Sequence, residues 1–193
     1  MVYVMSNLNG KFEEFLKMLS NINFKKKDKL YILGNSILKG PDGIKLLLYI
    51  MENNNIKLLL GEDELTVLKA LKDLEREFVS GIYREWINNQ GIKSLEDFER
   101  LDFKTKKNIY YYLLNIKNTA TLKLRRKSYL LDINGFNKDS DNIIIYGNVV
   151  PGEDNVDKKT NRLKKDKTRE RIGIYYEDKI TCLRLNDLKL FQL

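Results

Sequence analysis

A glycine-rich loop at residues 34–43 lies between two different sequence patterns. The apolar run at residues 30–33 before it is typical of a buried strand. After it, apolar residues recur at the spacing of one helix face, at Ile44, Leu47, Leu48 and Met51. The loop therefore connects a strand to a helix. In open parallel sheets, such loops lie at the carboxyl ends of strands, where ligands bind.

The same order of strand, loop and helix occurs twice more. Residues 2–5 are apolar, residues 6–10 read as a turn, and one helix face follows at Phe12, Phe15, Leu16 and Leu19. Residues 56–60 are apolar, and the acidic stretch Glu62, Asp63 and Glu64 opens a helix with Leu65, Leu68, Leu71, Leu74 and Phe78 on one face. Acids favour the first turn of any helix through its dipole, so these three need not form a site. The three units predict an α/β protein.

Residues 81–118 predict a small helical insertion. Apolar residues there fall at helical spacing, at Tyr83, Trp86 and Ile87 and again at Ile109, Tyr112, Leu113 and Ile116. Ser94 and Asp97 have the spacing of a capping box. The tyrosines at 110–112 lie beside lysines and could offer a stacking surface, but aromatic residues on an amphipathic helix usually belong to a core.

From residue 119 the pattern changes to that of strands. Residues 121–124 and 129–133 flank a basic turn and predict a hairpin, and residues 143–146 predict a buried strand. Residues 152–170 are polar and charge-rich, which predicts a long basic loop. Three short strands then end the sequence, at residues 171–176, 180–185 and 188–193.

Composition suits one globular domain over residues 1–193, since 42% of the residues are hydrophobic and 32% are charged. No apolar run could span a bilayer and no signal-peptide pattern opens the chain, so we expect a cytoplasmic location and no membrane partner. The sequence has no histidine, which removes imidazole as a metal ligand and as a general acid or base. The single Cys182 excludes an internal disulfide and fits an ordinary strand residue.

The formal net charge of +8 is concentrated in two segments. Residues 104–127 hold eight basic residues and no acid, and residues 158–171 hold eight basic residues against two acids. Clusters of Lys and Arg neutralise nucleic-acid phosphates, so nucleic acid is one candidate partner. Charge runs are more often simply solvated faces.

The loop at residues 34–43 resembles the second signature of calcineurin-like metallophosphoesterases, in particular their bacterial serine/threonine protein phosphatase and dinucleoside tetraphosphatase branch. That signature reads G-D-x-x-D-R-G, often followed by P-D-G. Other family motifs align in the same order: D-x-H-G with Asn7-Leu8-Asn9-Gly10, G-N-H-E with Gly61-Glu62-Asp63-Glu64, H-A-G with Ile133-Asn134-Gly135, and G-H-T-P with the stretch from Gly147-Asn148 to Pro151.

The resemblance extends from Val2 to Leu193. Residues 83–91 are similar to a family region that ends W-x-x-N-G-G and caps the cleft. The three terminal strands resemble the family's antiparallel meander, with Tyr175 in place of an Asp. The resemblance implies a four-layer α/β/β/α fold, in which helices flank a β-sandwich. It also implies metal-dependent phosphomonoesterase or protein phosphatase activity with two divalent metals such as manganese.

The site positions depart from the family pattern. Asn35, Leu38 and Lys39 stand where the second signature has Asp, Asp and Arg. The altered positions of the metal site are Asn7, Asn9, Asn35, Glu62, Asp63, Ile133 and Asn148. Neutral amides there replace carboxylates and the imidazoles are missing, so we expect no metal, no cofactor and no catalytic residue. Asp63 takes the place of the family's general acid, yet an ordinary Asp is ionised at neutral pH.

These features favour a catalytically inactive homologue, a pseudo-phosphatase that acts as a binding or regulatory module. Its partner would be a protein or a phosphate-bearing ligand, and Lys39 could hold a phosphate as a point charge. One alternative is nucleic-acid binding through residues 104–127 and 158–171. Another is weak metal-dependent phosphoesterase activity at a site rebuilt from Glu62, Asp63 and the asparagines.

Overall fold

The computed structural model describes residues 1–74, 86, 88, 91–134, 142–147, 156–157, 162–163, 171–174 and 179–193. Its larger sheet, called sheet A, has the strand order β11-β10-β1-β2-β3. These strands are β1 (Val2–Ser6), β2 (Lys29–Ile32), β3 (Ile56–Leu58), β10 (Thr181–Arg184) and β11 (Lys189–Gln192). β1, β2 and β3 are parallel, whereas β10 is antiparallel to both β1 and β11.

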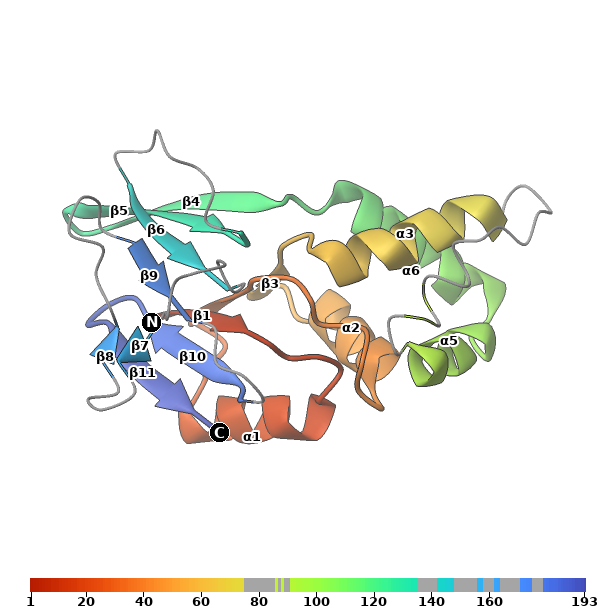
Figure 1. Cartoon of the computed structure of the whole chain (residues 1–193), viewed down its shortest axis with the longest axis horizontal. Coiled ribbons are helices and arrows are strands. Elements are labelled where there is room, and N and C mark those ends of the chain that lie inside the picture. The colour runs from red at the N-terminus through yellow and green to blue at the C-terminus, as the bar shows by residue number, and fades with distance from the viewer. Residues whose placement is uncertain are drawn as a thin grey trace.

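A helix follows each parallel strand, as the three sequence units predict. These helices are α1 (Phe12–Asn21), α2 (Gly43–Glu52) and α3 (Glu62–Leu74). Two more lie in the predicted insertion, α5 (Ile92–Glu99) and α6 (Phe103–Asn115). Figure 1 shows α3, α5 and α6 gathered at one end of the molecule and the sheets at the other. None of the described helices is long and apolar enough to cross a membrane.

The smaller sheet, sheet B, has the order β4-β5-β6-β9. Its strands are β4 (Thr119–Leu124), β5 (Lys127–Asp132), β6 (Ile143–Tyr146) and β9 (Arg171–Gly173). β4 and β5 form the predicted hairpin, and β6 and β9 continue the sheet in parallel pairs. Within the predicted loop at 152–170, β7 (Val156–Asp157) and β8 (Arg162–Leu163) form a short antiparallel pair, and the rest of that loop lies outside the described residues.

Two cores divide the side chains of sheet A between its faces. Tyr3 and Met5 belong to a core shared with the helices, whereas the intervening Val4 packs toward sheet B, as strand geometry requires. The core between the sheets also includes Leu33, Leu59, Tyr129, Leu131, Ile145, Ile172 and Leu183. The predicted α/β sandwich is confirmed. A helical layer over the outer face of sheet B, which the four-layer description implies, is not seen among the described residues.

Two sequence predictions are wrong in detail. The three terminal strands do not form one meander, because β9 pairs with β6 in sheet B while β10 and β11 belong to sheet A. The predicted capping box at Ser94 and Asp97 is also absent, because α5 already begins at Ile92. Ser94 is instead buried, where its hydroxyl accepts a hydrogen bond from Trp86 Nε1 at 2.9 Å and donates one to Gly91 O at 2.9 Å.

Ser94→Ala is expected to lower the free energy of unfolding by about 1–2 kcal/mol, because the buried Trp86 indole loses this acceptor. Urea unfolding followed by circular dichroism measures the change. Ser20→Ala, at an exposed position of α1, is the control and should stay within about 0.5 kcal/mol of the unmodified protein. Equal midpoints for the two variants would contradict the assigned role of Ser94.

Candidate functional site

The loops that follow β1, β2 and β3 meet at the carboxyl ends of these strands in sheet A. Their glycines lie so close together that no side chain fits between them. A Cβ on Gly10 would lie 3.0 Å from Gly40 Cα. A Cβ on Gly34, which has φ +58°, would lie 2.7 Å from Gly61 Cα and 3.0 Å from Ile133 Cδ1. The structure therefore brings the first four aligned motifs together at the carboxyl ends of the strands, where ligands bind in such sheets.

Backbone hydrogen bonds join the first loop to the second. Asn9 N donates to Asn35 O at 3.2 Å, and Gly10 N donates to Ser36 O at 2.7 Å. Asn7, Asn9 and Asn35 all have positive φ, at 65°, 45° and 52°. Asn adopts this left-handed region more readily than most residues. The three asparagines therefore suit the loop backbone as well as replacing the family's ligand types.

The amide side chains of these asparagines take part in the same network. Asn9 Nδ2 donates to Asn7 Oδ1 at 2.6 Å, and Asn7 Nδ2 donates to Lys179 O at 3.1 Å. Asn35 Oδ1 accepts from the backbone N–H of Glu62 at 3.1 Å, at the start of α3. Asn35 thus holds the second loop to the start of α3, and Asn7 holds the first loop to the segment before β10.

Glu64 is the central acceptor of the site. Its side chain is 0% exposed, and it accepts hydrogen bonds from the backbone N–H groups of Asn35 at 2.8 Å, Ser36 at 2.9 Å and Gly61 at 3.0 Å. Burial, reinforced by the neighbouring Asp63 carboxyl, raises the pKa of Glu64 to about 7. Sequence reasoning assigned Glu64 only to an acidic helix turn, although its match to the Glu of G-N-H-E could have indicated this position.

Asp63 faces the second loop from the same helical turn. It is 8% exposed and accepts from Leu38 N at 3.2 Å. Burial raises the pKa of Asp63, while the Leu38 N–H and the charge of Lys39 act against this rise. The ordinary titration expected from the sequence is therefore wrong for this side chain. Glu62, the third acid of the turn, is exposed.

The remaining predicted positions differ in their surroundings. Ile133 is buried beside Gly34, and its carbonyl accepts from Gly147 N at 3.2 Å. This contact brings the start of the fifth motif to the site, but Asn148 itself lies outside the described residues. Lys39 is exposed with φ 70°, and its charge lies close enough to influence Asp63. Phosphate binding at Lys39 stays a prediction.

Curated relatives share part of this sequence, although no protein-family model matches it. The symmetrical bis(5'-nucleosyl)-tetraphosphatase of Buchnera aphidicola (subsp. Schizaphis graminum) is 27% identical over 89 residues, which cover 45% of this chain and 33% of that protein. The protein of the same name from Wigglesworthia glossinidia brevipalpis is 30% identical over 95 residues, which cover 48% and 35%. The matched part of the chain thus spans about one third of these relatives' length.

Solved structures match over the whole chain. A metallophosphoesterase from Sphaerobacter thermophilus superposes with a TM-score of 0.57 at 11% identity, covering 99% of this chain and 86% of that one. A candidate diadenosine tetraphosphatase gives a TM-score of 0.60 at 12% identity, covering 100% and 92%. The protein has the metallophosphoesterase fold. The resemblance predicted from the motifs is confirmed.

The donor atoms at the described positions of this site do not fit the two-metal centre that the metallophosphoesterase fold implies. Among the described residues, no group of three or more His, Cys, Asp and Glu side chains could hold a metal ion. Ile133 cannot coordinate, and the two buried carboxylates, Asp63 and Glu64, already accept backbone N–H groups. Amide oxygens at Asn7 and Asn35 are neutral donors. We therefore derive no catalytic step through bound metals.

Proposed function

We propose that this protein is a metallophosphoesterase homologue that binds a partner without hydrolysing a phosphate ester, and that it acts as a regulatory module. The hydrogen-bonded network around Glu64 carries the proposal. Around it, backbone hydrogen bonds join the first loop to the second, and the side chains of Asn35 and Asp63 join the second loop to the start of α3. Intact loops with neutral side chains favour recognition over metal-dependent chemistry.

The electrostatics support the same conclusion. Two unit charges about 4 Å apart attract by roughly 4 kcal/mol at an effective dielectric near 20. Asn7 and Asn35 each forgo an attraction of this kind for a cation, which is larger still for a divalent ion. The burial that raises the pKa of Glu64 to about 7 further reduces the negative charge available near neutral pH.

The kind of partner that we propose depends on the cation that the site retains, Lys39. The relatives are named for bis(5'-nucleosyl)-tetraphosphates, so we propose that the loops of this chain keep affinity for a phosphate-bearing group through Lys39. Lys39 is an exposed cation beside the loops and would act as a point charge. The phosphate could belong to a nucleotide or to a phosphorylated protein partner.

The basic segment at 104–127, the candidate nucleic-acid surface, is divided between two places in the fold. That segment forms α6 and then β4, elements of 13 and 6 residues that are each about 20 Å long. Basic residues therefore lie at the start of α6 and at the tip of the hairpin, at two different ends of the molecule (Figure 1). Of the second basic segment, only residues 162, 163 and 171 are described.

We expect the protein to carry no stoichiometric metal and to show no turnover of p-nitrophenyl phosphate or diadenosine tetraphosphate in the presence of manganese. Elemental analysis of protein purified without chelator, together with a product assay, makes the measurement. Stoichiometric manganese with turnover by the unmodified protein would overturn the proposal in favour of a rebuilt site.

A variant in which the family's metal-ligand residues are restored tests the same proposal from the opposite direction. The combined variant Asn7→Asp, Asn9→His, Asn35→Asp and Ile133→His should bind manganese at least tenfold more tightly than the unmodified protein, because carboxylates and imidazoles return to the site. A control with Asn23→Asp and Asn118→Asp places charge on exposed positions outside the site and should change nothing. Equal manganese affinity in both variants would contradict the assignment of the site.

A further inference from the structure

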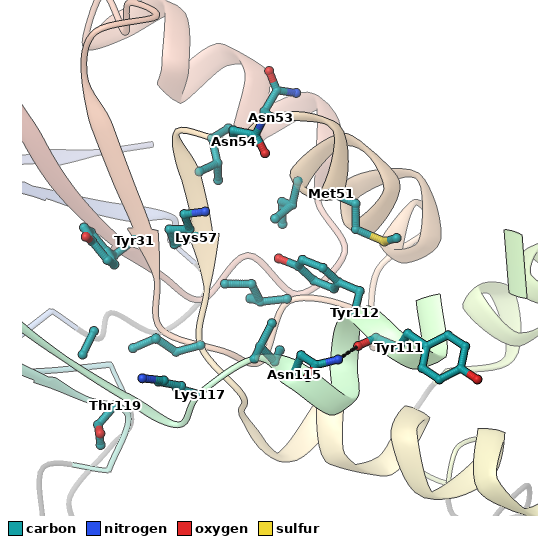
Figure 2. Close-up of a pocket in the computed structure, with 16 residues that line it drawn as sticks. Tyr31, Met51, Asn53, Asn54, Lys57, Tyr111, Tyr112, Asn115, Lys117 and Thr119 are labelled. Atoms are coloured by element: carbon teal, nitrogen blue, oxygen red, sulfur yellow. Dashed lines mark hydrogen bonds between the residues drawn. The ribbon is translucent and has the colours of Figure 1, made fainter. Parts of the chain in front are cut away.

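A groove of about 560 Å³ lies along the outer edge of β3 (Figure 2), and none of its lining residues belongs to the loops at 7–10, 34–43 and 61–64. It is bounded by the end of α2, by β3, by the end of α6 and by the start of β4. Its volume falls within the range of about 300–1,000 Å³ that is typical of small-molecule sites. Nothing in the proposed function uses this groove.

Edge strands often bind an added strand through their free N–H groups, but the backbone of β3 is already paired. Ile56 N donates to Asn53 O at 2.9 Å, and Leu60 N, just past the strand, donates to Lys117 O at 2.8 Å. Between them, the Tyr112 hydroxyl lies close enough to the Leu58 backbone to affect the pKa of that tyrosine. The N–H groups at both ends of β3 are therefore already paired, which leaves little outward backbone for an added peptide strand. The groove suits a compact ligand instead.

The walls of the groove suit a flat ring. Apolar side chains line it at Ile50, Met51, Ile56, Leu58, Leu59 and Ile116. The ring of Tyr112 projects from α6 into the middle of this set (Figure 2). Aromatic rings and aliphatic side chains together favour stacking of a heteroaromatic ring. Tyr111 points away from the groove in the same view, so Tyr112 is the stacking candidate.

Two carboxamides supply acceptors at the ends of the helices. Asn53 Nδ2 donates to Tyr49 O at 2.8 Å, and Asn115 Nδ2 donates to Tyr111 O at 2.7 Å. Each amide thereby fixes its orientation on the last turn of its own helix. Among the described residues no hydrogen bond reaches either Oδ1 atom, so both can accept from the amino or ring N–H of a base.

The charged side chains that line the groove are all positive. Lys57 and Lys117 line it, both are exposed, and neither forms an ion pair with a described residue. No Asp or Glu is among the lining residues. Figure 2 shows both lysines on the strand side of the groove, Lys57 on β3 and Lys117 between α6 and β4. An anionic group on the ligand is therefore favoured there.

We propose that this groove binds a nucleoside phosphate, with the base stacked on Tyr112 and within reach of the Asn53 and Asn115 oxygens, and with the phosphate between Lys57 and Lys117. The inference needs no metal and does not rest on the proposed function. It assigns a second site, separate from the loops around Glu64.

Isothermal titration calorimetry with AMP in the presence of EDTA tests the proposal. Lys57→Ala and Lys117→Ala should each weaken AMP binding about five- to tenfold, and added salt should weaken it further. Lys123→Ala removes an exposed charge from β4 outside the groove and should have no effect. Ala120→Trp, which fills the groove from β4, should abolish binding while circular dichroism stays unchanged.

Adenosine and inorganic phosphate separate the two halves of the ligand. Each should bind more weakly than AMP by at least tenfold. If adenosine bound as tightly as AMP and the lysine variants left AMP affinity unchanged, the proposed contact between the phosphate and the two lysines would be overturned. Phosphate binding as tight as AMP binding would overturn the aromatic part, and no AMP binding at millimolar concentration would overturn both. None of these outcomes depends on whether the protein turns over phosphate esters.

Discussion

Glu64→Ala is expected to lower the free energy of unfolding by about 3–5 kcal/mol, more than any other single change in the loops. The substitution removes the acceptor of three backbone N–H groups, those of Asn35, Ser36 and Gly61. The Glu64 side chain is fully buried, so water does not replace it. Each buried donor left without an acceptor costs about 1–3 kcal/mol. Urea unfolding followed by circular dichroism measures the loss.

Glu62→Ala is the matched control, because it removes an acid from the same helical turn. Glu62 is exposed, and only its backbone N–H is seen to bond Asn35. Its loss should change stability by no more than about 0.5 kcal/mol. Glu64→Gln should fall between the two, since it keeps one acceptor oxygen but turns an NH₂ group toward a backbone donor. Equal unfolding midpoints for Glu62→Ala and Glu64→Ala would contradict the role assigned to Glu64.

The strand, loop and helix units could be predicted because their information is local. Apolar runs and helical spacing place β1, β2 and β3 and the helices after them within a few residues of their observed bounds. Sheet membership depends instead on distant pairing. The segment at 171–173 reads like its neighbours along the chain, but β9 pairs with β6, and no periodicity in the sequence specifies that partner.

The residue types at the site could be predicted from the sequence, but the hydrogen-bond partners of their side chains could not. The missing carboxylates and imidazoles are visible at Asn7, Asn9 and Ile133 in the sequence alone. The partners of the remaining side chains come from elements far apart, such as Glu64 with Ser36 and Asn7 with Lys179. The raised pKa of Asp63 likewise arises from burial, which depends on the packing of the second loop over α3.

The free energy of unfolding should fall as pH rises through neutrality, because Glu64 has a raised pKa in the folded protein. This direction is unusual for an acid whose side chain accepts three backbone N–H groups. The pKa of Glu64 is about 7 in the folded protein, against an ordinary value of 4.5. Between these values the folded protein holds a proton that the unfolded chain has released. Stability from this group is therefore greatest on the acidic side of the window and falls as pH rises through 7. The full change is on the order of 3 kcal/mol.

Two other buried carboxyls shift in opposite directions. Burial raises the pKa of Asp63 and therefore adds to the same trend. Hydrogen bonds and a nearby positive charge lower the pKa of Asp28, whose contribution is present above its unfolded pKa and is lost only in more acidic solution. The interval from pH 5 to 8 therefore reports mainly on Glu64.

Urea unfolding at pH 5, 6, 7 and 8 gives the measurement, with Glu64→Gln as the variant that cannot titrate. The unmodified protein should lose stability across this interval, and the profile of Glu64→Gln should be flatter because the Glu64 contribution is gone. Glu62→Gln, at the exposed neighbour, should keep the slope of the unmodified protein. A flat profile in the unmodified protein would mean that the three N–H groups outweigh burial and keep Glu64 ionised. The loops would then be held by a buried anion, and the site would carry more negative charge toward a cation than we propose.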